Sequence, residues 1–209
     1  MRILFHAEGT RGDLYPLLAL GEACRDARHE VVVLAPDNFR AEVSARGFGF
    51  RSGGIDARAY LDRHAGAIVG GGLALVRAQR DYLASLIGTG FERLLAASED
   101  TDLLVGAGVC VTAATVAAAR GIPFRYVAYC PPLLPSDEHT PVLLGLSRRL
   151  PPWLNRLAWR WLMPALYLPI VRAVNRRRAE LGIVPERNGL RLVPGDDPVL
   201  LANDAEVTP

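Results

Sequence analysis

A short run near the N-terminus carries the residues best suited to chemistry. Residues 9 to 16 read Gly-Thr-Arg-Gly-Asp-Leu-Tyr-Pro and stand between an apolar run at 2–7 and a helical pattern at 14–27. Two glycines let the chain turn sharply out of a strand, and the N-terminus of the following helix offers unpaired N–H groups and a positive dipole end to an anion. The run is therefore predicted to handle a ligand, with the carboxylate of Asp13 at the mouth of the fold.

Two interpretations of Asp13 are open on this pattern. Asp is favoured at helix N-caps, and Leu-Tyr-Pro at 14–16 would then form the first helical turn. A carboxylate whose pKa is raised by partial burial would instead accept a proton from a hydroxyl. His6 is open as well: a lone histidine on a buried strand is typical of the core, although its place just before the loop also fits a site.

Alternating strand and helix patterns position this loop. Apolar, β-branched runs predict strands, and apolar residues at helical spacing predict helices. Strands are expected at 2–7, 30–35, 48–51, 102–107, 124–128 and 197–202, and helices at 14–27, 37–46, 73–97 and 111–120. The order predicts an α/β fold: a Rossmann-like doubly wound parallel sheet with helices on both faces.

The segment between the third and fourth strands is less regular. Residues 57–64 fit either a short helix or a loop, and the helix at 73–97 is interrupted near 88–90. Three glycines at 70–72 lack the Lys-Ser/Thr of a phosphate-binding loop, so they are predicted to link two helices.

The residues of the N-terminal loop also carry a family resemblance. Residues 6 to 21, His-Ala-Glu-Gly-Thr-Arg-Gly-Asp-Leu-Tyr-Pro-Leu-Leu-Ala-Leu-Gly, resemble the opening of the GT-B glycosyltransferases that attach sugars to sterols, glycopeptide antibiotics and other natural products. Gly-Ile-Pro at 121–123 and Asp-Leu-Leu-Val at 102–105 add weaker support.

The resemblance implies roles for four residues of the loop. Asp13 is implied as the general base that takes the proton of the acceptor hydroxyl, with inversion at the sugar. Thr10, Arg11 and Gly12 are implied to face the phosphates of the donor, a UDP- or TDP-linked sugar. For Arg11 a local ion pair with Glu8 or Asp13 is an equal alternative. The resemblance implies no cofactor and no metal.

The resemblance also implies a division of labour. Residues 1–209 are expected to form a single Rossmann-like N-terminal domain that binds a hydrophobic acceptor, and no counterpart of the C-terminal donor-binding domain follows. The chain alone is therefore expected to be inactive and to need that domain or a separate donor-binding chain. The alternative is a noncatalytic partner module that assists another transferase. A small nucleotide-binding protein is disfavoured, because the loop lacks G-x-G-x-x-G and Ala35 and Pro36 end the second strand.

A second unusual segment covers residues 142–181. Between 142 and 179 it holds eight arginines and three tryptophans but no acidic residue, and an apolar stripe recurs at helical spacing. A helix pair broken at Pro164 and Pro169 is expected. We expect the stripe of Leu154, Leu157, Ala158, Trp161 and Leu162 to pack on the domain. The alternative is a peripheral contact with an anionic membrane or a lipid-like acceptor.

Composition and residue spacing bear on nucleic-acid binding, metal binding and cellular location. A net charge of +2 gives no support for nucleic-acid binding. The three cysteines show no disulfide or zinc spacing, and Asp137, Glu138 and His139 lack spaced partners, so no metal is assigned. The N-terminus lacks a signal pattern, which predicts a cytoplasmic protein, peripheral at a membrane if residues 142–179 bind one. An apolar loop at 130–134 would suit a hydrophobic aglycone.

Overall fold

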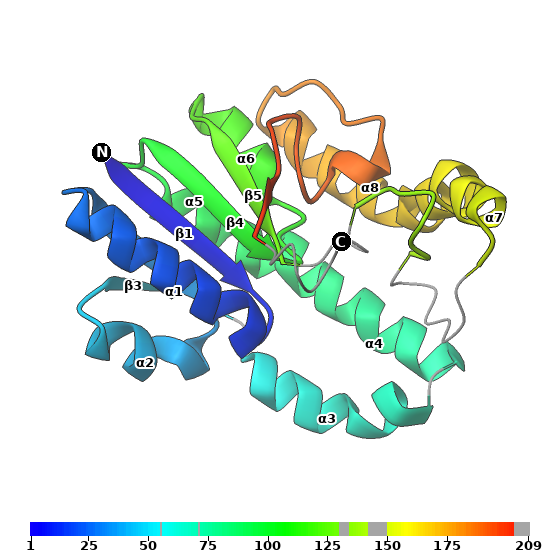
Figure 1. Cartoon of the computed structure of the whole chain (residues 1–209), viewed down its shortest axis with the longest axis horizontal. Helices are drawn as coiled ribbons and strands as arrows, with labels where there is room; N and C mark the ends of the chain where they lie inside the picture. Colours follow the sequence, from blue (N-terminus) through cyan, green and yellow to red (C-terminus); the bar gives the residue numbers. More distant parts are fainter. Residues whose placement is uncertain (55, 71, 130–133, 142–149, 203–209) are drawn as a thin grey trace.

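A single parallel sheet organises the chain (Figure 1). The computed structural model describes residues 1–54, 56–70, 72–129, 134–141 and 150–202. In this part of the chain the strands follow the order β3-β2-β1-β4-β5-β6, and every pair is parallel. The strands are β1 (Arg2–Glu8), β2 (Glu30–Ala35), β3 (Gly49–Ser52), β4 (Leu103–Gly108), β5 (Phe124–Ala128) and β6 (Leu200–Leu201). This order is that of a doubly wound Rossmann-like sheet, which confirms the predicted fold class.

Helices cover both faces because the strand side chains alternate between two apolar layers. One layer joins Ile3, Phe5 and Ala7 to the buried sides of α1 (Arg11–Asp26) and α2 (Arg40–Ala45). The other joins Leu4 and Leu104 to α5 (Phe91–Ala97) and α6 (Ala113–Arg120). Each fully buried aliphatic or aromatic side chain contributes about 1.5–3 kcal/mol to folding. The two layers therefore fix the register of the sheet and the direction of its carboxyl ends.

The open segment after β3 is helical. α3 (Ala57–Gly70) and α4 (Gly72–Ser85) pack against each other. Gly70 ends the first helix and Gly72 begins the second, which agrees with the prediction that this glycine run links two helices. α4 continues through a π-helical turn, η2 (Leu86–Gly90), into α5, where the sequence predicted an interruption. Figure 1 shows the α3–α4 pair beside the edge where β1 and β4 end.

Elements near the C-terminus differ from the prediction in two respects. α7 (Pro152–Leu157), the π-helical turn η5 (Ala158–Leu162) and α8 (Met163–Glu180) follow one another without a break, although breaks at Pro164 and Pro169 were expected. Pro164 lies in the first turn of α8, where a missing N–H is tolerated, and the wide turn η5 precedes it. A short 3-10 turn, η6 (Gly189–Arg191), follows, as η1 (Asp37–Phe39) does after β2.

The last strand is shorter than predicted. β6 contains only two residues, because the preceding Asp197 uses its side chain rather than its backbone: Oδ2 accepts the Phe124 N–H at 3.0 Å and lies 2.8 Å from the Arg125 guanidinium. Pro198 also lacks the N–H that a ladder requires.

The apolar stripe of the Arg/Trp-rich segment packs on the domain only in part. Leu154 is half-buried and Ala158 is buried, but Leu157, Trp161 and Leu162 are exposed, so the expectation is wrong for these three. Another set faces inward, led by Asn155 and Trp159. The Asn155 amide bonds the Thr140 hydroxyl and the Asp137 and Leu150 carbonyls, and the Trp159 indole N–H donates to the His139 carbonyl.

Candidate functional site

Asp13 occupies the first turn of α1, which begins three residues earlier than predicted. Thr10 has extended backbone angles and is the N-cap residue, and Asp13 is the third residue of the helix. The Thr10 backbone N–H donates to Asp13 Oδ2 at 2.8 Å, which is the carboxylate half of a capping box. The interpretation of Asp13 as the N-cap residue is therefore wrong by three positions, although its carboxylate does stabilise the helix start.

The Asp13 carboxylate lies where the strand order reverses. Gly9 follows β1, and Gly108 ends the neighbouring β4. Both glycines have positive φ, and a Cβ on either would press on the carboxylate: on Oδ2 from Gly9 and on Oδ1, at 3.0 Å, from Gly108. In open α/β sheets, ligands bind at the carboxyl ends of the strands at this reversal.

A second carboxylate, which the sequence analysis left without a site role, lies behind the first. Glu8 is the last residue of β1 and is 2% exposed. The Tyr82 hydroxyl, on α4, donates to Glu8 Oε1 at 2.7 Å, and His6 Nε2 lies 3.4 Å from Oε2. The Tyr82 ring also packs against the Tyr60 ring of α3. The α3–α4 pair is thus tied to the end of β1 by a buried polar contact.

His6 belongs to this buried layer. It is 4% exposed, and its Nδ1 is buried without a hydrogen-bond partner in the described residues. Its Nε2 faces the buried Glu8, which places His6 in the buried layer behind the loop.

The surroundings of Asp13 change its acidity. Burial raises the pKa of Asp13 above its ordinary value of 3.8; hydrogen bonds from Thr10 oppose this shift, and the negative charge of Glu8 adds to it. Burial likewise raises the pKa of Tyr82 and of Tyr129, so both phenols stay protonated. The Tyr129 hydroxyl donates to the Asp13 backbone carbonyl at 3.1 Å. The result is a carboxylate that is more basic than usual, flanked by neutral hydroxyl groups.

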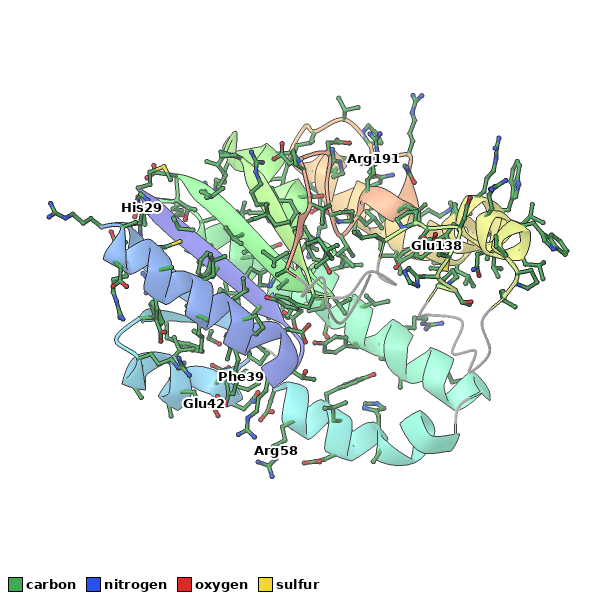
Figure 2. All side chains as sticks on the ribbon, viewed as in Figure 1. His29, Phe39, Glu42, Arg58, Glu138 and Arg191 are labelled. Atoms are coloured by element: carbon green, nitrogen blue, oxygen red, sulfur yellow. The ribbon has the colours of Figure 1, made fainter. Side chains whose placement is uncertain are left out.

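The other three predicted residues of the loop lie on the surface. Thr10, Arg11 and Gly12 are exposed at the N-terminus of α1. Arg11 pairs with Glu42 on α2 at 3.1 Å, so the alternative of an ion pair with Glu8 or Asp13 is wrong. Figure 2 labels Glu42 on that helix. Gly12 has helical backbone angles, and a Cβ there would meet only Thr10 Oγ1, at 3.6 Å.

Two cavities lie away from Asp13. One is lined by residues of α6, α8 and the segment before β6, and the other by apolar residues of α7, η5 and α8. The residues directly after β3, β4 and β5, at 53–54, 109–110 and 129, lie at the same edge of the sheet as Asp13. Of the loop at 130–134 that was predicted to suit an aglycone, residues 130–133 lie outside the described residues. Within the described part of the chain no group of three His, Cys, Asp or Glu side chains forms a metal site.

Comparison with solved structures defines the class of fold. The glycosyltransferase SsfS6 of Streptomyces sp. SF2575 superposes with a TM-score of 0.55 at 23% identity, covering 96% of this chain and 49% of that one. The glycosyltransferase VinC, solved with dTDP, gives 0.58 at 18% identity and covers 98% and 49%. The chain therefore has the fold of one Rossmann-like half of a GT-B glycosyltransferase.

Sequence comparison finds relatives that are also glycosyltransferases. The vancomycin aglycone glucosyltransferase of Amycolatopsis orientalis is 31% identical over 148 residues, which is 69% of this chain and 35% of that protein. The sterol 3-beta-glucosyltransferase UGT80B1 of Arabidopsis thaliana is 29% identical over 168 residues, 74% of this chain and 26% of that protein. No family model matches the chain. The resemblance to the N-terminal domain of these glycosyltransferases is confirmed, and the chain spans well under half the length of these two relatives.

Proposed function

We propose that this chain is the acceptor-binding part of a glycosyltransferase that moves a sugar from a nucleoside diphosphate sugar to a hydroxyl of a hydrophobic natural product or sterol-like lipid. One observation carries the proposal: Asp13, with a raised pKa, stands between the ends of β1 and β4. The relatives' names, a glycopeptide aglycone glucosyltransferase and a sterol glucosyltransferase, support the class of acceptor.

Asp13 is the general base in this proposal. Its Oδ2 is held by the Thr10 N–H, which fixes the orientation of the carboxylate, and Oδ1 faces Gly108 across the strand ends. The acceptor O–H gives its proton to the carboxylate as the oxygen forms a bond to the anomeric carbon. The bond from that carbon to the diphosphate breaks, and the leaving group takes the electron pair. A base with a raised pKa accepts this proton more readily, and general base catalysis contributes about 10²–10⁴-fold in rate.

The start of α1 is proposed to face the donor diphosphate. Thr10, Arg11 and Gly12 are exposed residues at the positive end of the helix dipole, and Arg11 would exchange its pairing with Glu42 for the diphosphate. The rest of the donor site is assigned to a C-terminal donor-binding domain or a separate chain, since the relatives extend well beyond the region that matches.

The test is sugar transfer by this chain joined to, or mixed with, a donor-binding half. UDP- and TDP-sugars are assayed against glycopeptide aglycones, macrolide aglycones and sterols. Asp13→Asn keeps an oxygen for the Thr10 N–H but cannot take the proton. We expect it to lower kcat at least 100-fold while acceptor affinity changes less than threefold.

A matched variant separates catalysis from folding. Asp26→Asn alters an exposed carboxylate at the opposite end of the same helix, α1, and is expected to leave turnover unchanged. Full turnover in Asp13→Asn with a normal fold would favour the noncatalytic partner module instead. Loss of acceptor binding in Asp13→Asn would mean that this carboxylate binds rather than deprotonates.

A further inference from the structure

An exposed apolar face runs along α7, η5 and α8. Its members are large side chains that the described part of the domain leaves exposed: Trp153 (59% exposed), Leu157 (46%), Trp161 (66%), Leu162 (43%), Leu166 (50%) and Leu168 (44%). The opposite side of the same helices carries the buried contacts of Asn155, Trp159 and Met163. The segment therefore has apolar side chains on two sides, and only one of these sides is buried against the described part of the domain. We call the exposed set the α7–α8 surface.

Positive charge accompanies this surface. Arg160 stacks on Trp161, with its guanidinium carbon 5.7 Å from the ring centre, and Arg172 and Arg176 are exposed along α8. No acidic side chain of the described residues pairs with these three, whereas Arg156 pairs with Asp137 and Arg177 with Glu92 and Glu180. The sequence from 142 to 179 contains no acidic residue at all. The surface is thus apolar and cationic with no internal charge to neutralise it.

We propose that the α7–α8 surface binds the face of an anionic phospholipid bilayer, with the two tryptophans and the leucines in the interface and the arginines against lipid phosphates. Trp prefers the boundary between headgroups and acyl chains, and an amphipathic cationic helix lies in that plane. None of the described helices has the length and hydropathy to cross a bilayer. The contact is therefore peripheral, and it does not depend on the proposed transfer reaction.

Two other occupants, a small molecule and a second copy of the chain, fit this surface less well. Trp153 and Leu168 are 15 positions apart, which along a helix is about 22 Å, longer than a single small-molecule site. In a symmetric dimer through this surface the arginines of one copy would meet those of the other, because a two-fold contact uses the same patch twice. An anionic bilayer supplies both the apolar layer and the opposite charge.

The test is co-sedimentation of the chain with vesicles of phosphatidylcholine alone or of phosphatidylcholine with phosphatidylglycerol. We expect binding to the anionic vesicles only, and weaker binding at high salt. Each arginine at an anionic surface is worth roughly a fivefold change in partitioning. The double variant Arg172→Gln, Arg176→Gln is therefore expected to lose roughly 25-fold, and Trp153→Ser with Trp161→Ser at least tenfold. Val184→Ser changes an exposed apolar side chain off this surface and is the matched control, expected to stay within twofold.

A second measurement needs no variant. Quenching of tryptophan emission by brominated phosphatidylcholine in the anionic vesicles is expected, because two of the chain's three tryptophans lie on the surface. Equal binding to neutral and anionic vesicles, unchanged binding of the arginine variant, or absence of quenching would each overturn the proposal. Self-association without lipid that the tryptophan variant abolishes would assign the surface to a second copy instead.

Discussion

Replacing Gly12 and Gly9 by alanine separates what the fold requires from what a ligand requires. Gly12 is the second residue of α1, has ordinary helical backbone angles, and would place a Cβ no closer than 3.6 Å to a described atom outside its own turn. Alanine in a helix is favoured over glycine by about 0.5–1 kcal/mol, and less in the first turn. Gly12→Ala is therefore expected to leave the free energy of unfolding unchanged or to raise it by about 0.5 kcal/mol.

Gly9→Ala is the opposite case. Gly9 has φ +143°, and its Cβ would overlap Asp13 Oδ2, the atom that caps α1. A backbone conformation of this kind costs a residue with a side chain about 1–3 kcal/mol. Loss of the cap adds about 1 kcal/mol. We expect Gly9→Ala to lower the free energy of unfolding by about 2–4 kcal/mol.

Urea titration of the two variants measures these changes, and nucleotide binding completes the comparison. If Gly12 lies against the donor diphosphate, the added methyl group blocks the backbone N–H without harming the fold. TDP affinity, measured calorimetrically with the donor-binding half present, is expected to fall at least tenfold in Gly12→Ala. A loss of more than about 1 kcal/mol in Gly12→Ala, or a Gly9→Ala variant as stable as wild type, would contradict these expectations.

Three further changes test the surroundings of the site. Because the pKa of Asp13 is raised above 3.8 in the folded chain, ionisation of Asp13 lowers the free energy of unfolding as the pH rises through the raised pKa. In urea titrations over this pH range, the stability of Asp13→Asn should therefore rise relative to that of wild type. A difference in stability that does not change with pH would contradict the shift. Tyr82→Phe removes the donor to buried Glu8 and should cost about 1–3 kcal/mol, whereas a neutral result would deny the contact. Asn155→Ala strips three hydrogen bonds from a fully buried site; thermal unfolding should show a loss of about 2–4 kcal/mol, and a loss under 1 kcal/mol would contradict the network.

The sheet was predictable because its strands are continuous apolar runs that need cover on both sides. The runs at 2–7, 30–35 and 124–128 match β1, β2 and β5 to within a residue, since burial on both faces leaves little choice of conformation. β6 was overestimated because Asp197 and Pro198, next to an apolar run, replace backbone pairing by a side-chain bond. An apolar run does not reveal where a side-chain hydrogen bond replaces backbone pairing.

The site was predictable in part. The glycine-bounded loop indicated Asp13 as a site residue. The predicted start of the helix was three residues too late, because Thr10 rather than Asp13 is the N-cap residue. Glu8 and Tyr82 were missed as a pair because they are 74 positions apart and meet only when α4 crosses the end of β1. The one available signal was an acidic residue directly after the apolar run at 2–7 that predicted the strand.

The exposed tryptophans show a different limit. Helical spacing told which residues share a face, but not which face the domain would cover. Asn155 and Trp159 face inward because the segment around 137–140 offers them carbonyl partners, and this turns Trp153 and Trp161 outward. In Figure 2, Glu138 lies in this segment beside α7.

The titration of Asp13 itself tests the central claim most directly. The side-chain carbonyl carbon of Asp13, assigned by comparison with Asp13→Asn, is followed by carbon NMR across the acid range in the intact chain. A midpoint above 3.8 is expected, and it should fall when Glu8→Gln removes the neighbouring buried acid. A midpoint at or below 3.8 would contradict a basic carboxylate at the strand reversal and remove the physical ground for its role in proton transfer.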